Sequence, residues 1–299
     1  MKKIIILGAN SYIARNVLFY LKSTQEKLDI SLYDYAPAHL DGEENYSQLN
    51  ILSKDEVSRI DFSCDVIFMF VGKTGSANGF DDYKMFIEVN ENALLNVLHA
   101  CKQQASGAKI VFPSTRLVYK GKKGILLEDS EKEFKTVYAI NKFSCETYLK
   151  QFHDVFGLNY VIFRICIPYG TMIPNVSSYG TAEFMLSKAT AGQNISLYGD
   201  GSVRRTLTYI YDLCKTLVEG AFCNECCNDV YNIGGENYSL KEMATIIAHK
   251  YAVGIDYVDW PEIALKIESG DTVFDDSKLV AVIGKTCNTS FEAWITNTQ

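Results

Sequence analysis

The chain has 299 residues, which is long enough for one large α/β domain with a smaller appended lobe. Its net charge of -7 argues against nucleic acid as a partner, because a phosphate backbone favours basic surfaces. The chain has no run that approaches the roughly 18 apolar residues of a membrane span. The apolar run Ile4–Leu7 is too short for the core of a signal peptide.

Nine cysteines are scattered along the chain without a disulfide framework. Because an export signal is also missing, this pattern predicts reduced thiols in a cytoplasmic protein. Cys223, Cys226 and Cys227 form the one cluster, where a zinc site is one interpretation. A structural zinc site needs four ligands, and no second pair follows at a suitable spacing, so we expect no bound metal.

Short apolar runs alternate with longer amphipathic runs through the first half of the chain. The predicted strands cover residues 4–7, 28–33, 66–71, 109–112 and 160–165, and the predicted helices cover residues 12–21, 83–104 and 137–156. Strands that are apolar throughout and separated by helices indicate a parallel sheet covered on both faces. We therefore predict an α/β fold with a doubly wound parallel sheet of the Rossmann type.

The rhythm of strands and helices breaks after Gly170, where Gly, Pro, Ser and Asn cluster through Tyr179. This change predicts a second, smaller lobe, with the chain returning to the sheet. We expect residues 1–166 and parts of 206–236 to form the nucleotide-binding domain. Residues 167–205 and 237–299 are expected to form the substrate-binding lobe.

Residues 8–14, with the sequence Gly-Ala-Asn-Ser-Tyr-Ile-Ala, join the first predicted strand to the first helix. Gly8 permits a tight turn, and the exposed amides at the start of the helix suit a pyrophosphate. Ser11 replaces the usual middle glycine of such a turn, and an ordinary strand–helix turn remains an alternative. The residues expected to bind the cofactor here are Gly8, Asn10, Ser11, Tyr12 and Ile13.

Asp34 ends the second predicted strand, 26 residues after Gly8. An acidic side chain at this point can bind the 2′-hydroxyl of a ribose and repels a 2′-phosphate. Asp34 therefore favours NAD over NADP as the cofactor. The alternative is an aspartate that caps a turn at the end of the strand.

Tyr138 and Lys142 are four residues apart on a predicted helix and share one face of it. An ammonium beside a phenol favours the phenolate and brings its pKa from about 10 toward neutrality. Such a tyrosine could move a proton on and off a hydroxyl while a cofactor takes a hydride. Packing at the border of the core is the alternative explanation. Thr115, after the fourth strand, could bind a substrate oxygen or simply cap a helix.

The order of these features resembles the extended short-chain dehydrogenase/reductases over nearly the whole chain. The glycine turn, Asp34, Asn90, Thr115 and the Tyr138–Lys142 pair follow one another as in that family. The segments that resemble its nucleotide-sugar epimerase/dehydratase branch come later, at residues 163–170, 198–201, 205–212 and 231–234. The resemblance implies an NAD-dependent enzyme that acts on a nucleotide sugar.

The resemblance also implies roles for individual residues. Tyr138 would be the catalytic acid and base, and Thr115 would orient the sugar oxygen. Lys142 would bind the nicotinamide ribose and tune Tyr138, and Asn90 would lie near the cofactor. Arg205 would contact the substrate diphosphate. The helices at residues 83–104 and 137–156 would form the interface of a homodimer, although packing within one subunit produces the same pattern.

Departures from the family pattern argue against some of the reactions that the family catalyses. Dehydratases of this branch carry an Asp-Glu pair where this chain has Arg116 and Leu117, which argues against dehydration. Leu117 also replaces a cysteine of the bifunctional epimerase-reductases. At the substrate end, Ile167 replaces a common asparagine, and Glu268 stands where a second diphosphate-binding arginine is usual.

The favoured function is that of an isomerase: an NAD-dependent nucleotide-sugar epimerase that acts at carbon 4 through a keto sugar. One alternative is an oxidoreductase, a 4-ketoreductase or dehydrogenase of deoxysugar or surface-polysaccharide biosynthesis. Another is a non-catalytic NAD(H)-binding regulatory module. The expected small-molecule partner is a nucleotide sugar, with neither nucleic acid nor a membrane as a partner.

Overall fold

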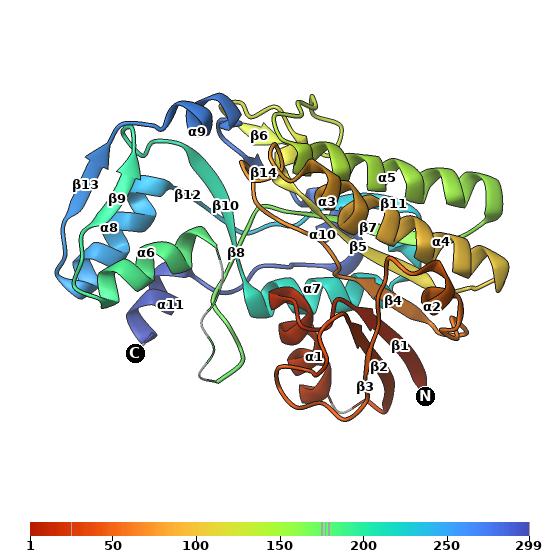
Figure 1. The fold of residues 1–299 in the computed structure, drawn as a ribbon. Helices are drawn as coiled ribbons and strands as arrows, with labels where there is room; N and C mark the ends of the chain where they lie inside the picture. The colour runs from red at the N-terminus through yellow and green to blue at the C-terminus, as the bar shows by residue number, and fades with distance from the viewer. Residues whose placement is uncertain (25, 175, 177, 179, 299) are drawn as a thin grey trace.

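A seven-stranded parallel sheet forms the centre of the larger domain (Figure 1). The computed structural model describes residues 1–298 except residues 25, 175, 177 and 179. The strands, in sheet order, are β3 (Tyr46–Gln48), β2 (Leu28–Asp34), β1 (Lys2–Leu7), β4 (Val66–Met69), β5 (Lys109–Thr115), β7 (Asn159–Ile165) and β11 (Asp229–Asn232). The order changes direction between β1 and β4, and ligands bind at such switch points in open α/β sheets.

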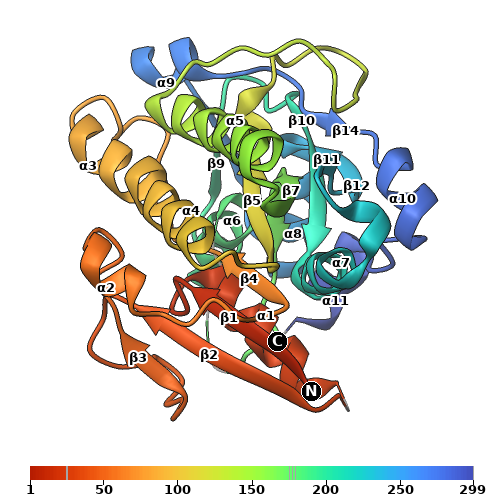
Figure 2. The ribbon, with the colours of Figure 1, turned by 90° about the vertical axis from the view of Figure 1, so that its right-hand side faces the viewer.

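Helices cover both faces of this sheet, as its apolar strands require (Figure 2). On one face, α1 (Tyr12–Ser23), α7 (Ile210–Phe222) and α10 (Ser277–Ile283) bury Val17, Leu213 and Leu279 in one core cluster. On the other face, α2 (Lys54–Ser58), α4 (Ala93–Gln103) and α5 (Val137–Phe156) bury Val57, Leu98 and Leu149 in a second cluster. The predicted doubly wound α/β fold is therefore confirmed.

The predicted helical stretch at residues 83–104 is confirmed, and it contains a turn of another helix type. Residues 83–104 form α3 (Tyr83–Ile87), a π-helical turn at Glu88–Asn92, and then α4. The backbone N–H of Ala93 bonds to the carbonyl of Glu88, five residues back. Asn90 lies within this π-helical turn and is buried; such turns are frequent at functional sites. A hydrophobic period of 3.6 residues does not reveal such an insertion.

The smaller lobe has its own core, built from small sheets and three helices. Its strands are β8 (Ile167–Tyr169), β10 (Arg204–Tyr209), β12 (Glu236–Ser239), β9 (Ile195–Tyr198) and β13 (Ile255–Val258). Its helices are α6 (Thr181–Thr190), α8 (Leu240–Tyr251) and α11 (Phe291–Asn297). Met185, Met243 and Phe291 are buried together between these elements. The predicted domain boundaries stay a prediction, and the predicted end of the loop at Tyr179 lies outside the described residues.

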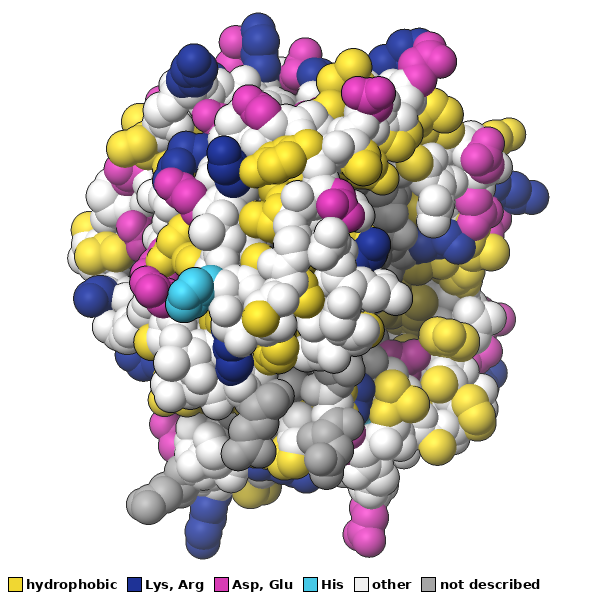
Figure 3. Space-filling view, turned by 90° about the vertical axis from the view of Figure 1, so that its left-hand side faces the viewer, with side chains coloured by type: hydrophobic (Ala, Val, Ile, Leu, Met, Phe, Trp, Pro, Cys, Tyr) yellow, Lys and Arg dark blue, Asp and Glu magenta, His cyan; other side chains and the backbone are white. Residues whose placement is uncertain are grey.

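Three remaining elements lie beside the two domains: β6 (Ile125–Leu126), β14 (Val273–Phe274) and α9 (Glu262–Ile267). β14 pairs with β6, so residues near 270 reach the segment that follows β5. Basic, acidic and hydrophobic side chains are interspersed over the surface of the smaller lobe (Figure 3). Within the part of the chain that the structure describes, no helix is long and apolar enough to span a membrane.

Candidate active site

The turn between β1 and α1 lies against the end of β4. Gly8 has φ +81°, and a Cβ at this position would be 2.6 Å from the backbone nitrogen of Val71. Only glycine suits both the left-handed backbone and this close approach. Beside the turn is a cavity of about 780 Å³ that Gly8, Asp34 and Gly72 help to line. Its size falls in the range of cofactor sites, and it lies at the switch point of the sheet.

Asp34 is buried at the end of β2, and its carboxylate orders the glycine turn. One carboxylate oxygen accepts from the backbone N–H of Asn10 at 2.9 Å, and the other accepts from that of Tyr35 at 2.8 Å. Each oxygen keeps a second lone pair, so a ribose hydroxyl can still donate to it. The structure therefore brings Gly8 and Asp34 to the same cavity. Their predicted contacts with NAD remain a prediction.

The other residues of the predicted cofactor turn use their side chains within the protein. Asn10 donates to the carbonyl of Ala38 and accepts from the N–H of Leu40, which holds the loop after β2. Ser11 caps α1 by accepting from the N–H of Ala14 at 3.4 Å. Asn10 and Ser11 nevertheless line the cavity.

Tyr12 and Ile13 lie on the first turn of α1. The hydroxyl of Tyr12 donates to the carbonyl of Gly170 at 2.5 Å, which ties α1 to the end of β8, and burial raises the pKa of this phenol. Ile13 packs against the core cluster on the α1 face. Backbone contacts of these two residues with a cofactor remain a prediction.

Lys142 on α5 is held at the end of β5. Its ammonium donates to the carbonyl of Pro113 at 2.8 Å and lies 5.9 Å from the centre of the Tyr138 ring. It also lies 4.4 Å from the centre of the Phe112 ring. Burial lowers the pKa of Lys142 to about 8. The predicted pair thus shares one side of α5, and the lysine retains two further hydrogens to donate.

Asn90 and Lys142 meet at Gly72, on the edge of the cavity. A Cβ at Gly72 would lie 3.2 Å from Oδ1 of Asn90 and 3.7 Å from Nζ of Lys142. Asn90 accepts from the N–H of Lys73 at 2.7 Å and donates to its carbonyl at 3.1 Å, which fixes the loop after β4. These contacts join the cavity to the Tyr138–Lys142 pair, as one continuous nucleotide site requires.

Thr115 is the last residue of β5 and is buried. Its hydroxyl oxygen accepts from the N–H of Leu117 at 3.2 Å, so its hydrogen can be donated to a ligand oxygen. Lys142 bonds to the carbonyl of Pro113, two residues earlier in the same strand. β5 therefore carries both the threonine and the anchor of the lysine.

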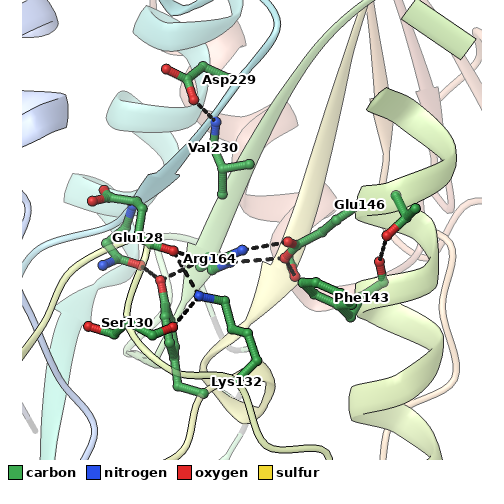
Figure 4. Close-up of polar contacts among 12 residues, drawn as sticks. Glu128, Ser130, Lys132, Phe143, Glu146, Arg164, Asp229 and Val230 are labelled. Carbon is green, nitrogen blue, oxygen red and sulfur yellow. Dashed lines mark hydrogen bonds and ion pairs between the residues drawn. The ribbon is translucent and has the colours of Figure 1, made fainter. Parts of the chain in front are cut away.

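A buried ion pair lies one helical turn beyond Lys142, and sequence reasoning missed it. Glu146 on α5 accepts twice from Arg164 on β7, at 3.0 and 2.6 Å, and it also accepts from Ser114 (Figure 4). Burial alone would lower the pKa of Arg164, but its bonds to Glu146 outweigh burial and raise it. Arg164 also donates to the hydroxyl of Tyr119 at 2.6 Å. No local sequence pattern marks this pair, because Glu146 and Arg164 lie on different elements and meet only in the folded chain.

Arg205 on β10 is buried and forms an ion pair. It donates to Glu268 at 2.6 Å, to the carbonyl of Gly270 at 2.6 Å and to that of Arg204 at 3.0 Å. The unusual Glu268 therefore neutralises the arginine that was predicted to bind the diphosphate. The predicted role of Arg205 stays a prediction, because a phosphate would have to compete with this carboxylate.

Comparisons with known proteins agree with this architecture. The model of the NAD dependent epimerase/dehydratase family matches residues 4–234. A putative UDP-glucose 4-epimerase of Methanocaldococcus jannaschii is 22% identical over 255 residues, which are 83% of this chain and 82% of the relative. The match with the family confirms the predicted resemblance, the NAD cofactor and an enzymatic activity.

Solved structures show the same fold. Pal from Bacillus thuringiensis aligns with a TM-score of 0.87 and 21% identity, over 99% of this chain and 97% of that one. The UDP-glucose 4-epimerase of Thermus thermophilus, solved in complex with NAD, aligns with a TM-score of 0.83 and 20% identity, over 98% and 96%. At such identities the likeness extends to the fold and leaves the substrate open.

Proposed function

Because the chain belongs to the NAD-dependent epimerase/dehydratase family, we propose that it is a nucleotide-sugar epimerase acting at carbon 4. The observation that carries this proposal is the Tyr138–Lys142 pair, with Lys142 fixed on Pro113 of β5 and bordering the cavity at Gly72. The related chain of M. jannaschii carries the name of a putative UDP-glucose 4-epimerase, which supports the same reaction class.

The residues around the cavity fit a dinucleotide. Gly8 allows the turn before α1 to lie close against the backbone of Val71, and the start of a helix such as α1 suits a phosphate. Asp34 can accept from a ribose hydroxyl, and Lys142 can donate to the second ribose through its remaining hydrogens. NAD bound there would accept a hydride from the sugar and return it.

The proton steps belong to the side chains of this chain. Tyr138 takes the proton of the C4 hydroxyl as the keto group forms, and it returns the proton when the hydroxyl forms again. The positive charge of Lys142 stabilises the phenolate during this step. Thr115 donates its hydrogen to the sugar oxygen and holds it near Tyr138. After the keto sugar has turned, the same groups serve its opposite face.

Dehydration fits these residues poorly. Loss of water needs an acid and a base beside the reacting carbons, and the two positions after Thr115 hold Arg116 and Leu117. An arginine stays protonated and a leucine has no proton to transfer. A reversible change at C4 needs only the tyrosine, the lysine and the threonine.

We also propose that the enzyme is a cytoplasmic homodimer. All nine cysteines, which lie within the described residues, are free thiols, as expected of a reducing compartment. Tyr83 and Ile87 on α3 and Ile140 on α5 are exposed hydrophobic residues on neighbouring helices. Such a face is suited to a symmetric contact with a second copy. Sedimentation velocity with an Ile87→Lys, Ile140→Lys double variant tests the dimer.

An interconversion assay tests the reaction. The purified protein with added NAD should convert UDP-glucose or UDP-N-acetylglucosamine into its C4 epimer, detected by proton NMR. Tyr138→Phe removes the proton-transfer group and should lower kcat by about 10²- to 10⁴-fold while NAD binding is retained. Formation of NADH in proportion to a keto-sugar product would replace the epimerase with an oxidoreductase.

A further inference from the structure

A second arginine lies beside the Arg205–Glu268 pair and is not part of the catalytic set. Arg116 directly follows Thr115, so its backbone starts about 3.8 Å from that of the threonine. It donates one hydrogen bond to the hydroxyl of Ser269, at 3.1 Å. Arg116 therefore spans from the end of β5 to the loop that contains Glu268.

Arg116, Arg205 and Glu268 form a cluster with two positive charges and one negative charge. The titratable groups that act on Arg116 are Arg205, which lowers its pKa, and Cys166 and Glu268, which raise it. Glu268 bonds directly to Arg205 and to the N–H of Gly270, at 2.6 and 2.9 Å. Two guanidinium groups thus share one carboxylate, and Arg116 is the one without a direct bond to it among the described residues.

The surroundings make this excess charge costly. Arg116 is partly buried, and burial together with the nearby Arg205 lowers its pKa to about 10. A partly buried cation is stabilised when an anion takes up its remaining donors. Its guanidinium has five N–H groups, and one hydrogen bond from it to another described residue is present. The cluster lacks one negative charge, and a ligand can supply it.

We propose that Arg116 binds an oxyanion of the substrate. It would supply the positive charge for that anion, because the charge of Arg205 is neutralised by Glu268. This inference rests on the proposed function, because it places the anion on the nucleotide sugar that the site would hold. Either the nucleotide diphosphate or a carboxylate on the sugar has the required chemistry, since both accept the paired donors of a guanidinium.

The surrounding loop holds Arg116 in a defined place. Lys122 donates its N–H to the carbonyl of Asp271 at 3.1 Å, and Lys135 donates to the carbonyl of Glu268 at 2.8 Å. A Cβ at Gly121 would lie 1.9 Å from the carbonyl oxygen of Ser269, so the two segments are in close contact. An arginine fixed between them binds an anion with little loss of conformational entropy.

Binding measurements by calorimetry test the proposal without requiring turnover. UDP, UDP-glucose and UDP-glucuronic acid are titrated into the NAD-loaded wild-type protein and into Arg116→Gln. Charge-assisted hydrogen bonds of this kind predict a loss of roughly 10- to 100-fold in affinity. A loss with all three ligands identifies the diphosphate, and a loss with UDP-glucuronic acid alone identifies a sugar carboxylate.

Three variants separate anion binding from structural support. Ser269→Ala removes the internal partner of Arg116 and should change affinity less than threefold. Arg116→Lys should regain part of the lost affinity, because it keeps the charge. Glu268→Gln frees Arg205 and should tighten binding, even if Arg116→Gln folds poorly. Equal affinities of wild type, Arg116→Gln and Glu268→Gln would overturn the proposal. If none of the three ligands binds the wild type, UDP sugars are not substrates and the proposed function is wrong for that class.

Discussion

The proposed cofactor site and the proposed sugar site of this molecule are built in different ways. At the proposed cofactor site, backbone contacts shape the cavity. Gly8 turns the chain against the end of β4, and Asp34 accepts from two backbone amides. At the proposed sugar site, side chains pair with one another across long stretches of sequence, as Arg205 does with Glu268. The first region therefore depends on backbone geometry, whereas the second depends on ion pairs between side chains that are far apart in the sequence.

The residues that we propose to be catalytic lie near the buried ion pair between Glu146 and Arg164, and Glu146 also accepts from Ser114, the neighbour of Thr115. Glu146→Gln should produce the largest change in stability, because it leaves Arg164 buried without its charge partner. We expect the free energy of unfolding to fall by about 3–5 kcal/mol in urea titrations.

The exposed pair Lys266–Glu262 provides a matched control for this change. Glu262→Gln should alter the free energy of unfolding by less than about 0.5 kcal/mol. If Glu146→Gln and Glu262→Gln lowered the free energy of unfolding by the same small amount, the buried ion pair would not stabilise the fold as its geometry indicates.

Replacing Lys142 should raise stability, in contrast to Glu146→Gln, because the ammonium of Lys142 is a buried charge without a carboxylate bonded to it among the described residues. The pKa of Lys142 is lowered to about 8, so below that pH the folded chain carries an unfavourable buried charge. Lys142→Met removes the charge and also the bond to Pro113. We expect the variant to be more stable than wild type by about 2 kcal/mol at pH 7, with activity lost.

The stability gained by Lys142→Met should depend on pH. The folded pKa of Lys142 lies below its value in the unfolded chain, so wild type regains stability as pH rises from about 8 toward 10.5. The advantage of Lys142→Met should shrink over that interval. Urea unfolding of both proteins at pH 7 and pH 9.5 measures this difference in the free energy of unfolding. A difference that stayed constant with pH would contradict the lowered pKa of Lys142.

Asp34 should give the smallest effect, confined to the proposed cofactor site. Asp34→Ala removes an acceptor for the ribose hydroxyl and the charge that repels a 2′-phosphate. We expect NAD to bind about 10-fold more weakly and the preference over NADP to decrease. Fluorescence titrations with both cofactors measure this. Unchanged affinities for the two would show that Asp34 serves only the turn between β1 and α1.

The sequence was sufficient for the fold because its elements follow local rules, whereas the residues predicted to contact NAD stay a prediction. Apolar runs identified five strands of the large sheet, and α5 begins and ends at the predicted residues, Val137 and Phe156. The π-helical turn at Asn90 was missed because one inserted residue leaves the apolar pattern almost unchanged. Glu146–Arg164 and Arg116–Ser269 were missed because such partners meet only in the folded chain.

The central claim is that a hydrogen leaves C4 of a nucleotide sugar as a hydride and returns to the same carbon, with Tyr138 moving the hydroxyl proton. The most direct test uses a UDP-hexose deuterated at C4, incubated with the protein and NAD and followed by NMR. The account predicts a C4 epimer that retains deuterium at C4, with little product from Tyr138→Phe. Exchange of the deuterium with water during epimerisation would contradict it.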